Sequence, residues 1–564
     1  MACIALAAFL PILTEAQSTP QPDPRFTKLL EDLLPGIDAP DISAIQRAEK
    51  SADKRLIAPL IDRAKFAKSR EELLALVSAL RKLTGEKFAA PEDGWTDAMV
   101  WYGKQTGLQP PPGYTAWKGE LYGREIDPRF RFLLYKDAPA AVRVEEVTWG
   151  GVKPGGIPAL VNPKTLDAAE ADYLADTDAV FGVSMDGDHR AYPLRILDWH
   201  EMANDVVGGK PVALAYCTLC GAGILFDATA GKASYKFGSS GLLFRSNKLM
   251  FDDSSYTLWN QITGEPVLGK LAGKGIKLKI LPLVLTSWGE WKRQHPDTKV
   301  LDPNTRHKRP YRPGAAYGPY FGSPDTMFPV WRQSRRFPKK ARVFALRVDG
   351  APKAYPLDEL NQAGGIANDA LGGKNVVVVY RDAVGQVPLP SGWKREIAKS
   401  RNASDKIEFA NDLTIETARA VLKQKPSLIK EMTAECLLAM PTQARLALLK
   451  ERTQDQKQGA KAGKGKFPAD LRNEVAVRGL IGETRAYERG GYTFSASNSG
   501  SASNSGSASK AGDSLTDERG RLWRITEEAL VGPGEERLPR LGGHLAYWFG
   551  WFAFFPRTEV FEAP

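Results

Sequence analysis

The chain has 564 residues, of which 43% are hydrophobic and 25% are charged, as is ordinary for globular proteins. This length predicts several domains. The net charge is +11, but Lys and Arg are spread along the chain, whereas nucleic-acid-binding proteins concentrate them on one face or in one arm. The composition therefore argues against nucleic acid as a partner.

The first residues form a short apolar run that ends at Thr14-Glu-Ala16 and is followed by a polar, Pro-rich stretch. This pattern predicts a signal peptide over residues 1–16 and export to the periplasm or the cell exterior. Cys3 lies so close to the start that a lipidated N-terminus, which would anchor the protein to a membrane, is an alternative. The run is too short to span a bilayer, and we expect no transmembrane segment elsewhere.

The N-terminal part of the chain is predicted to be helical. Residues 17–45 are rich in Pro and suit a linker. Ser69-Arg-Glu-Glu72 has the pattern of a capping box, apolar residues follow at helical spacing, and Gly85 ends the pattern. We therefore expect a helical hairpin region over 46–110 and a connector over 111–169.

Residues 170–301 are predicted to form a β-rich domain. Short apolar runs at 179–183, 211–216 and 223–226 are typical of strands. The segment from Pro193 to Val207 favours a short helix, with Pro in its first turn. The domain is therefore expected to combine several strands with a short helix.

A second stretch of the chain repeats the sequence pattern of this domain. Tyr192-Pro-Leu and Gly208-Gly-Lys recur 163 or 164 residues downstream as Tyr355-Pro-Leu and Gly372-Gly-Lys. A Trp-x-x-Trp motif and a Pro-x-Thr-x-Val motif recur at an offset of 260 residues. A shared set of scaffold residues predicts a shared fold. The expected fold class is α+β, with two tandem related β-rich domains produced by internal duplication.

The second copy is predicted to be split by an insertion. After a connector over 302–334, its first part covers 335–385 and its second part covers 481–564. The intervening residues 386–480 have helical patterns and are expected to form a helical insertion. A low-complexity tract of Ser, Ala, Asn and Gly at 495–510 predicts a disordered loop.

Four residues with reactive side chains occur in the first copy alone. In the alignment of the two copies, Arg381 and Val384 stand in the place of the only closely spaced cysteines. Residues that one copy lacks are not needed for the common fold. We therefore interpret the following as site residues: His200, Glu201, Cys217 and Cys220.

A metal site is the first hypothesis for these residues. Cys217 and Cys220 have the spacing of a metal knuckle, and His200 precedes the strand that leads to Cys217, so its ring can return to the same ion. Two thiolates and one imidazole suit zinc or copper and do not suit Mg or Ca. Three protein ligands leave a position open, as in catalytic sites, with Glu201 or Asp198 as the proton-transfer partner. The protein would then be a metal-dependent enzyme or a metal carrier.

Two other classes of function stay open. In an oxidising compartment a Cys-x-x-Cys pair tends to form a disulfide or to act as a redox dithiol, which would make this a thiol–disulfide redox protein. A structural or interaction protein that uses the helical arm is the third class. The sequence does not decide whether the protein is an enzyme, and its ligand stays an unidentified small molecule or metal ion.

The motifs of the first copy resemble a known family. They are Tyr-Pro-Leu-Arg-Ile-Leu-Asp-Trp-His-Glu, Asn-Asp-x-x-Gly-Gly-Lys-Pro-Val, Tyr-Cys-x-Leu-Cys-Gly, and Gly238-Ser-Ser-Gly-Leu-Leu243 with Asp252 and Trp259. The chain is thereby similar, over about residues 145–385 and 480–561, to the bacterial and archaeal family called domain of unknown function 3179. The resemblance implies that Trp-His-Glu and Cys-x-Leu-Cys are the family signature, but it implies no activity. Thr218 departs from the Pro that members often carry.

Overall fold

The protein combines helices and strands, which confirms the α+β class. The expected signal peptide and most of the low-complexity tract lie outside the residues that the structure describes, as do Cys3, Val384 and Cys436. The computed structural model describes residues 24–36, 42–89, 91–381, 391–400, 415–424, 427–428, 437, 440, 483–497 and 513–564.

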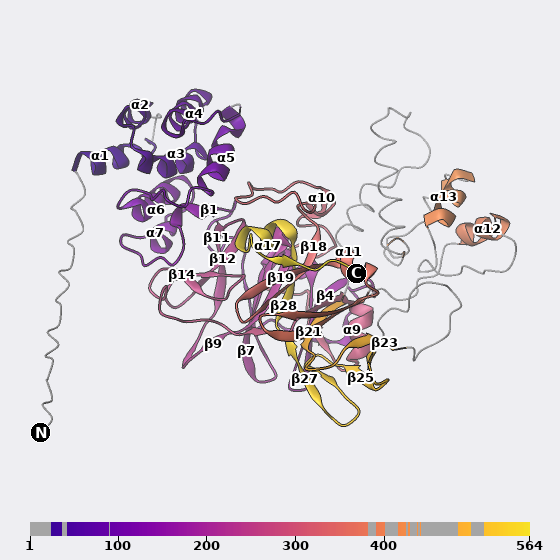
Figure 1. Cartoon of the computed structure of the whole chain (residues 1–564). Helices are drawn as coiled ribbons and strands as arrows, with labels where there is room; N and C mark the ends of the chain where they lie inside the picture. Colours follow the sequence, from indigo (N-terminus) through magenta and orange to yellow (C-terminus); the bar gives the residue numbers. More distant parts are fainter. Residues whose placement is uncertain are drawn as a thin grey trace, which may run out of the picture.

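A group of helices lies at one end of the molecule (Figure 1). The predicted capping box is present, because the Ser69 side chain accepts a hydrogen bond from the Glu72 N–H at 3.1 Å. Gly85 ends that helix in the left-handed region, with a φ of 79°. Within the described ranges, none of the helices has the length and apolar character that a membrane span requires. The N-terminal helices are α1 Pro24–Asp32, α2 Ile42–Ser51, α3 Ile57–Ala64, α4 Arg70–Thr84, α5 Pro91–Tyr102, α6 Tyr114–Glu125 and α7 Phe130–Leu133.

This helical region is larger than the sequence predicts. Helix α1 lies within 17–45, where a linker is expected, and helix α6 lies within the expected connector at 111–169. Leu33 and Leu121 are fully buried in the same apolar core. Burial of such side chains stabilises a fold by roughly 1.5–3 kcal/mol each, so tertiary packing overrides the linker-like composition.

The first β region, which we define as residues 147–301, contains three main sheets. Their strand orders are β16-β4-β5-β17-β3, β15-β8-β7-β6-β2 and β1-β11-β12-β13-β14, and a small sheet pairs β10 with β9. The strands are β1 Val147–Trp149, β2 Leu160–Val161, β3 Thr165–Asp167, β4 Ala179–Met185, β5 Asp188–Pro193, β6 Met202–Val207, β7 Lys210–Cys217, β8 Ala222–Asp227, β9 Thr229–Ala230, β10 Ala233–Ser234, β11 Phe237–Phe244, β12 Asn247–Asp252, β13 Leu258–Asn260, β14 Pro266–Leu268, β15 Ile280–Leu281, β16 Val284–Ser287 and β17 Lys299–Leu301. The helices are α8 Leu194–His200 and α9 Trp288–Gln294, and α10 Gly318–Gly322 follows in the connector.

The second β region, which we define as the described residues from 342 to 560 without α12 and α13, contains two sheets. Their strand orders are β28-β18-β19-β29 and β20-β21-β22-β27-β26-β25-β24-β23. The strands are β18 Arg342–Val348, β19 Ala351–Pro356, β20 Ile366–Leu371, β21 Lys374–Arg381, β22 Glu483–Glu488, β23 Phe494–Ala496, β24 Ser514–Asp517, β25 Leu522–Ile525, β26 Ala529–Val531, β27 Arg537–Leu541, β28 Gly543–Tyr547 and β29 Glu559–Val560. The helices are α11 Leu357–Gln362 and α17 Trp548–Phe554, with α12 Ser391–Ser400 and α13 Ile415–Gln424 in the expected insertion.

The two β regions share strand order and contacts. The order β16-β4-β5-β17 matches β28-β18-β19-β29, and in both sheets the last pair is parallel while the others are antiparallel. Three side-chain hydrogen bonds of 2.8 to 3.0 Å recur. They are Tyr192–Asp205 with Tyr355–Asp369, Trp259–Asp252 with Trp523–Asp517, and Trp291–Thr298 with Trp551–Thr558.

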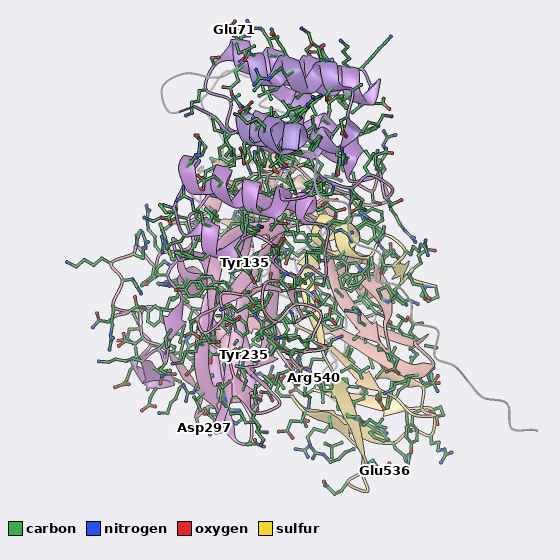
Figure 2. The ribbon with its side chains drawn as sticks, turned by 90° about the vertical axis from the view of Figure 1, so that its left-hand side faces the viewer. Glu71, Tyr135, Tyr235, Asp297, Glu536 and Arg540 are labelled. Carbon is green, nitrogen blue, oxygen red and sulfur yellow. A yellow bond between two sulfur atoms is a disulfide. The ribbon has the colours of Figure 1, made fainter. Side chains whose placement is uncertain are left out.

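The two β regions lie side by side beneath the helices (Figure 2). Buried side chains of both contribute to one apolar core, in which Phe181 and Tyr216 of the first region join Phe344 and Tyr547 of the second. Helix α17 approaches the chain segment after β7, since a Cβ atom at Gly550 would lie 3.6 Å from Cβ of Cys220. The second region therefore forms part of the surroundings of the two cysteines.

Asn204 should be one of the side chains that stabilise the first β region most. Its amide donates to the carbonyl of Phe237 at 2.9 Å and accepts from the Phe237 N–H at 2.8 Å. Asn204→Ala leaves both buried backbone groups without these partners, so we expect a loss of about 2 kcal/mol in the free energy of unfolding. Urea denaturation measures the change. Asn375→Ala, at an exposed amide, is the control and should change it by less than about 0.5 kcal/mol.

Candidate functional site

The two cysteines lie in a tight connection between two buried antiparallel strands. Strand β7 ends at Cys217, a short 3-10 turn covers Thr218–Cys220, and β8 begins at Ala222, which pairs with Cys217. Gly221 has a φ of 59°, and a Cβ atom there would lie 3.1 Å from the ring of Tyr547. Glycine is therefore required both by the turn and by the close approach of the second β region.

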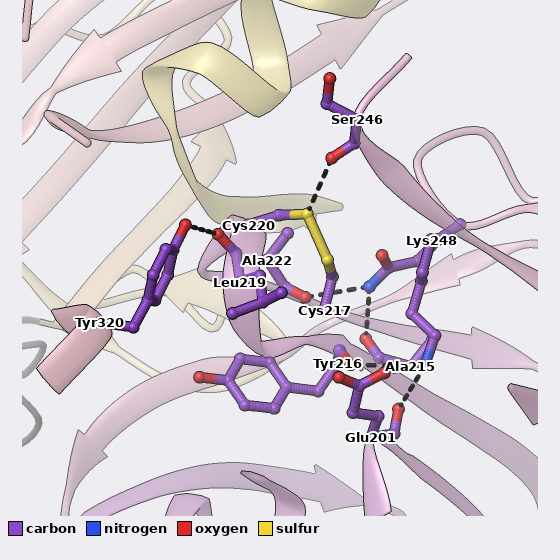
Figure 3. Close-up of a disulfide and its surroundings, with 11 residues drawn as sticks. Glu201, Ala215, Tyr216, Cys217, Leu219, Cys220, Ala222, Ser246, Lys248 and Tyr320 are labelled. Carbon is purple, nitrogen blue, oxygen red and sulfur yellow. Dashed lines mark hydrogen bonds and ion pairs between the residues drawn. A yellow bond between two sulfur atoms is a disulfide. The ribbon is translucent and has the colours of Figure 1, made fainter. Parts of the chain in front are cut away.

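Cys217 and Cys220 are joined in a disulfide, with a Cα–Cα distance of 5.2 Å (Figure 3). Cys217 is 4% exposed and Cys220 is fully buried. The Cys220 sulfur lies 3.3 Å from the carbonyl oxygen of Ser246. A disulfide sulfur has no hydrogen to donate, so only the reduced Cys220 thiol gains a hydrogen bond at this position. The surroundings thus offer the reduced form a contact that the oxidised form cannot use.

His200 does not lie with the cysteines as a ligand. Its Nδ1 is 2.8 Å from the carbonyl oxygen of Pro158 and its Nε2 is 2.5 Å from the hydroxyl of Tyr311. A carbonyl oxygen only accepts, so Nδ1 carries the hydrogen and Nε2 accepts from Tyr311. Both ring nitrogens are therefore occupied by protein groups.

The expected three-ligand metal site is not assembled. Among the residues that the structure describes, no group of three or more His, Cys, Asp or Glu side chains is arranged to hold a metal ion. The structure does not support the hypothesis that His200, Cys217 and Cys220 bind one zinc or copper ion, for two physical reasons. The His200 ring is used by Pro158 and Tyr311, and the two sulfurs are bonded to each other.

A small cavity of about 50 Å³ opens onto one of the two sulfur-bearing residues. It is lined by Cys217 and by the side chains of Glu201 and Lys248. Tyr317 and Phe328, which belong to the connector between the two β regions, line it from another side. Cys220 is not among its lining residues, so the cavity distinguishes the two members of the disulfide.

Glu201 and Lys248 form a buried ion pair at this cavity. The Lys248 Nζ lies 3.1 Å from Glu201 Oε2 and 3.1 Å from the Glu201 carbonyl oxygen. Burial lowers the pKa of Lys248, and the charge of Glu201 opposes that shift. Glu201 ends helix α8 with a φ of 53°, in a region that non-glycine residues rarely adopt. The sequence predicts Glu201, one member of this ion pair, as a site residue, but it does not point to the other member, Lys248.

Asp198 lies one helical turn before Glu201 and is also buried. Burial raises the pKa of its carboxyl group well above the ordinary value, the charge of Glu201 raises it further, and the Thr218 hydroxyl acts in the opposite direction. Burial thus favours the uncharged form of the Asp198 carboxyl group. Its Oδ1 has no hydrogen-bond partner among the described residues. The sequence-based candidate for proton transfer is thus a buried acid near Thr218, the residue after Cys217.

The connector at 302–334 lies against the cysteine turn and is fastened to the first β region along its length. Its hydrogen bonds to that region have lengths of 2.5 to 3.4 Å. They join Trp199 to the Pro310 carbonyl, His200 to Tyr311, Tyr320 to the Leu219 carbonyl, and Ser246 to both the Pro329 carbonyl and the Trp331 N–H. Trp199 and His200 therefore bind the connector, whereas Glu201, the next residue of the motif, lines the cavity.

The neutral state of His200 should make the protein sensitive to mild acid. Burial, with smaller contributions from His307 and Arg309, lowers the pKa of His200 to about 4, although its contact with Pro158 works against the shift. A histidine that is held neutral contributes stability above its unfolded pKa of about 6.5, and that contribution is lost as the pH falls from there toward 4. We expect the free energy of unfolding to fall less steeply between pH 6.5 and 4.5 in His200→Gln than in the wild type, as measured by urea titrations. Equal slopes would contradict the assignment. Burial also lowers the pKa of His295 to about 4, so His295→Gln should flatten the same pH range and serves as the positive control.

The corresponding position in the second β region has different chemistry. Arg381, which aligns with Cys217, is paired with Glu483 at 2.5 Å, with Asp513 at 2.5 Å and with Glu290 at 3.2 Å. These ion pairs occupy the space at the end of β21. Val384, the counterpart of Cys220, lies outside the described residues.

The fold and the site define a two-part β protein with a helical arm and a buried two-cysteine disulfide beside an ion-paired cavity. A family model described as "Protein of unknown function (DUF3179)" matches residues 154–428. This segment of the chain thus matches the family, which confirms the resemblance seen in the sequence. Neither the search of curated proteins nor the search of solved structures gave a match. The family description assigns no activity.

Proposed function

We propose that this protein is a thiol–disulfide redox protein whose reactive group is the Cys217–Cys220 pair. The observation that carries the proposal is the disulfide itself, with Cys217 at a cavity and Cys220 buried behind it. A purely structural disulfide needs no cavity and no polar groups at one sulfur. Exchange, by contrast, requires access to one sulfur and a stabilised leaving group on the other.

The reaction follows the ordinary course of thiol–disulfide exchange. A thiol RSH loses its proton, and its thiolate attacks the Cys217 sulfur. The bond between the two protein sulfurs breaks, the electron pair goes to Cys220, and Cys220 takes up a proton. A second RSH then attacks the mixed disulfide and releases RSSR, which leaves both cysteines as thiols. The two electrons that reduce the pair come from the two thiols, and the reverse sequence oxidises them.

Four residues support this chemistry. The reduced Cys220 thiol would donate to the Ser246 carbonyl, which favours Cys220 as the protonated member of the pair. The buried carboxyl group of Asp198, whose pKa is raised, is the candidate for proton transfer near Thr218 of the cysteine turn. Lys248, in the same cavity as Cys217, supplies a positive charge that favours a thiolate there. Glu201 holds Lys248 in place.

The second β region supports the nearness of Lys248 and Cys217. Arg381 aligns with Cys217, and Asp513 aligns with Lys248. Lys248 lies four residues before Asp252, and Asp513 lies four residues before Asp517; each of these two later aspartates accepts a hydrogen bond from a buried Trp. Arg381 and Asp513 form an ion pair at 2.5 Å. Positions that contact each other in one region are expected to be neighbours in the other.

The same comparison underlies our proposal that the two β regions arose by internal duplication. The matching strand orders and the three recurring hydrogen bonds support it, together with the offsets in the sequence. We also propose that the protein works in an oxidising compartment after export, because disulfides persist there and are rare in reducing compartments. The apolar start of the sequence supports this location.

Thiol trapping of single cysteine variants tests the function, in a background where Cys3 and Cys436 are replaced by Ala. Cys220→Ser should leave a Cys217 thiol that forms a mixed disulfide with a small disulfide reagent, whereas Cys217→Ser should leave a buried and unreactive Cys220 thiol. Mass spectrometry of the native proteins distinguishes these results. The double variant is the control and should fold without reacting. A stoichiometric zinc or copper content that disappears in the double variant would contradict the redox function.

A further inference from the structure

We infer that the Cys217–Cys220 pair exchanges with a small thiol or disulfide rather than with a cysteine on the surface of a folded protein, and that Tyr317 and Phe328 set this limit. The inference rests on the proposed redox function and adds the class of its substrate. It follows from the size of the cavity, from Tyr317 and Phe328, which we call its roof, and from the hydrogen bonds that hold the connector on either side of them.

The cavity is too small for a protein partner. Its volume of about 50 Å³ has room for a few water-sized groups, given that one water needs roughly 10–15 Å³ on the same measure. Pockets for drug-sized ligands have about 300–1,000 Å³. Cys217 is 4% exposed, so a thiolate must enter the cavity to reach its sulfur. The sulfur end of a small thiol fits these dimensions, whereas a cysteine on a folded surface does not.

The roof of the cavity comes from the connector. Tyr317 and Phe328 line it together with Leu219, the middle of the cysteine turn. Tyr317 lines the cavity together with Glu201, and its pKa is raised first by burial and then by the charges of Glu201 and Asp198. Both aromatic residues are partly exposed, whereas Cys217, Glu201 and Lys248 of the same lining are buried, so the aromatic residues lie on the solvent side.

The roof is held on both sides of these aromatic residues. Tyr320 donates to the Leu219 carbonyl at 2.5 Å, and Ser246 contacts the connector at Pro329 and Trp331. Lys340 donates to the carbonyl of Ser323 at 2.9 Å and strengthens the same segment. A roof fastened in this way keeps its shape when a ligand arrives, so entry is selected by size.

The test compares two reductants on the full-length native protein. One is cysteine, and the other is a small folded protein with a reactive surface dithiol. Each rate of disulfide reduction is divided by the rate on a cyclic disulfide peptide with the sequence of residues 216–221, which corrects for intrinsic reactivity. We expect this ratio to be at least about tenfold lower for the protein dithiol than for cysteine, because only access differs after the correction.

The roof variant Tyr317→Ala/Phe328→Ala should raise the ratio for the protein dithiol about tenfold and change the ratio for cysteine little. Tyr256→Ala, at a tyrosine that is 47% exposed, is the matched control and should change neither. Where the double alanine variant fails to fold, Tyr317→Leu/Phe328→Val takes its place.

Equal ratios for the two reductants, or a roof variant that behaves like the wild type, would overturn the size limit and leave the redox function standing. A native disulfide that neither reductant opens, while the peptide reacts with both, would overturn the redox function and the size limit together. These outcomes distinguish a failure of the size limit from a failure of the redox function.

Discussion

Lys248→Met is expected to lower the free energy of unfolding by about 3–5 kcal/mol, because it leaves a buried carboxylate without its cation. Lys248 and Glu201 are 3% and 7% exposed, and the ammonium group contacts both the Glu201 carboxylate and the Glu201 carbonyl. The low exposure of both side chains limits how far water can replace these contacts. Equilibrium denaturation in urea at neutral pH measures the loss.

The double variant Lys248→Met/Glu201→Gln tests the reason for this loss. It removes both charges, so we expect it to recover part of the stability that the single variant loses. Lys374→Met is the control, because its pair with Glu488 is exposed and such pairs contribute about 0–1 kcal/mol. A single variant as stable as the wild type would show that the pair is not buried in solution.

Glu483→Leu should lower the free energy of unfolding by about 3 kcal/mol or more, because it leaves buried guanidinium groups short of an acceptor. Glu483 accepts from Arg485 at 2.7 Å, from Arg381 at 2.5 Å and from Thr286 of the first β region at 2.5 Å. The side chain is fully buried. The contact with Thr286 means that the loss affects the junction of the two β regions as well.

The same residue predicts a pH dependence. Burial raises the pKa of Glu483, but the charges of Arg485 and Arg381 outweigh this and hold the pKa below its ordinary value. The pairing therefore contributes stability above pH of about 4.5 and loses it as the pH falls further. Glu483→Leu should flatten the acid limb of a stability–pH curve. Asp513→Asn, at an aspartate whose side chain is 61% exposed, is the control and should lower stability far less.

Much of the fold follows from local sequence patterns. The capping box at Ser69 and the stop at Gly85 give the ends of α4, because capping depends on residues within one turn. The Trp-x-x-Trp repeat corresponds to α9 and α17, whose second Trp residues each donate to a Thr seven positions later. Helix α1 could not be predicted, because its stability comes from a core formed by distant helices.

The site could be predicted only in part. The comparison of the two copies singles out Cys217, Cys220 and Glu201, and the structure brings all three to one place. The direction of the His200 ring is set by Pro158 and Tyr311, which are 42 and 111 residues away, so sequence spacing could not give it. Lys248 could have been noticed as a charged residue in the apolar strand Asn247–Asp252, where a lysine needs a partner.

The most direct test of the redox function is the reduction potential of the Cys217–Cys220 pair in the full-length protein. The protein is equilibrated in dithiothreitol redox buffers, its free thiols are alkylated, and the reduced fraction is counted by mass spectrometry. A redox function predicts a midpoint between about −270 and −120 mV, where exchanging dithiols lie. A midpoint below about −300 mV, as in structural disulfides, or a reduced pair that holds one equivalent of metal, would contradict it.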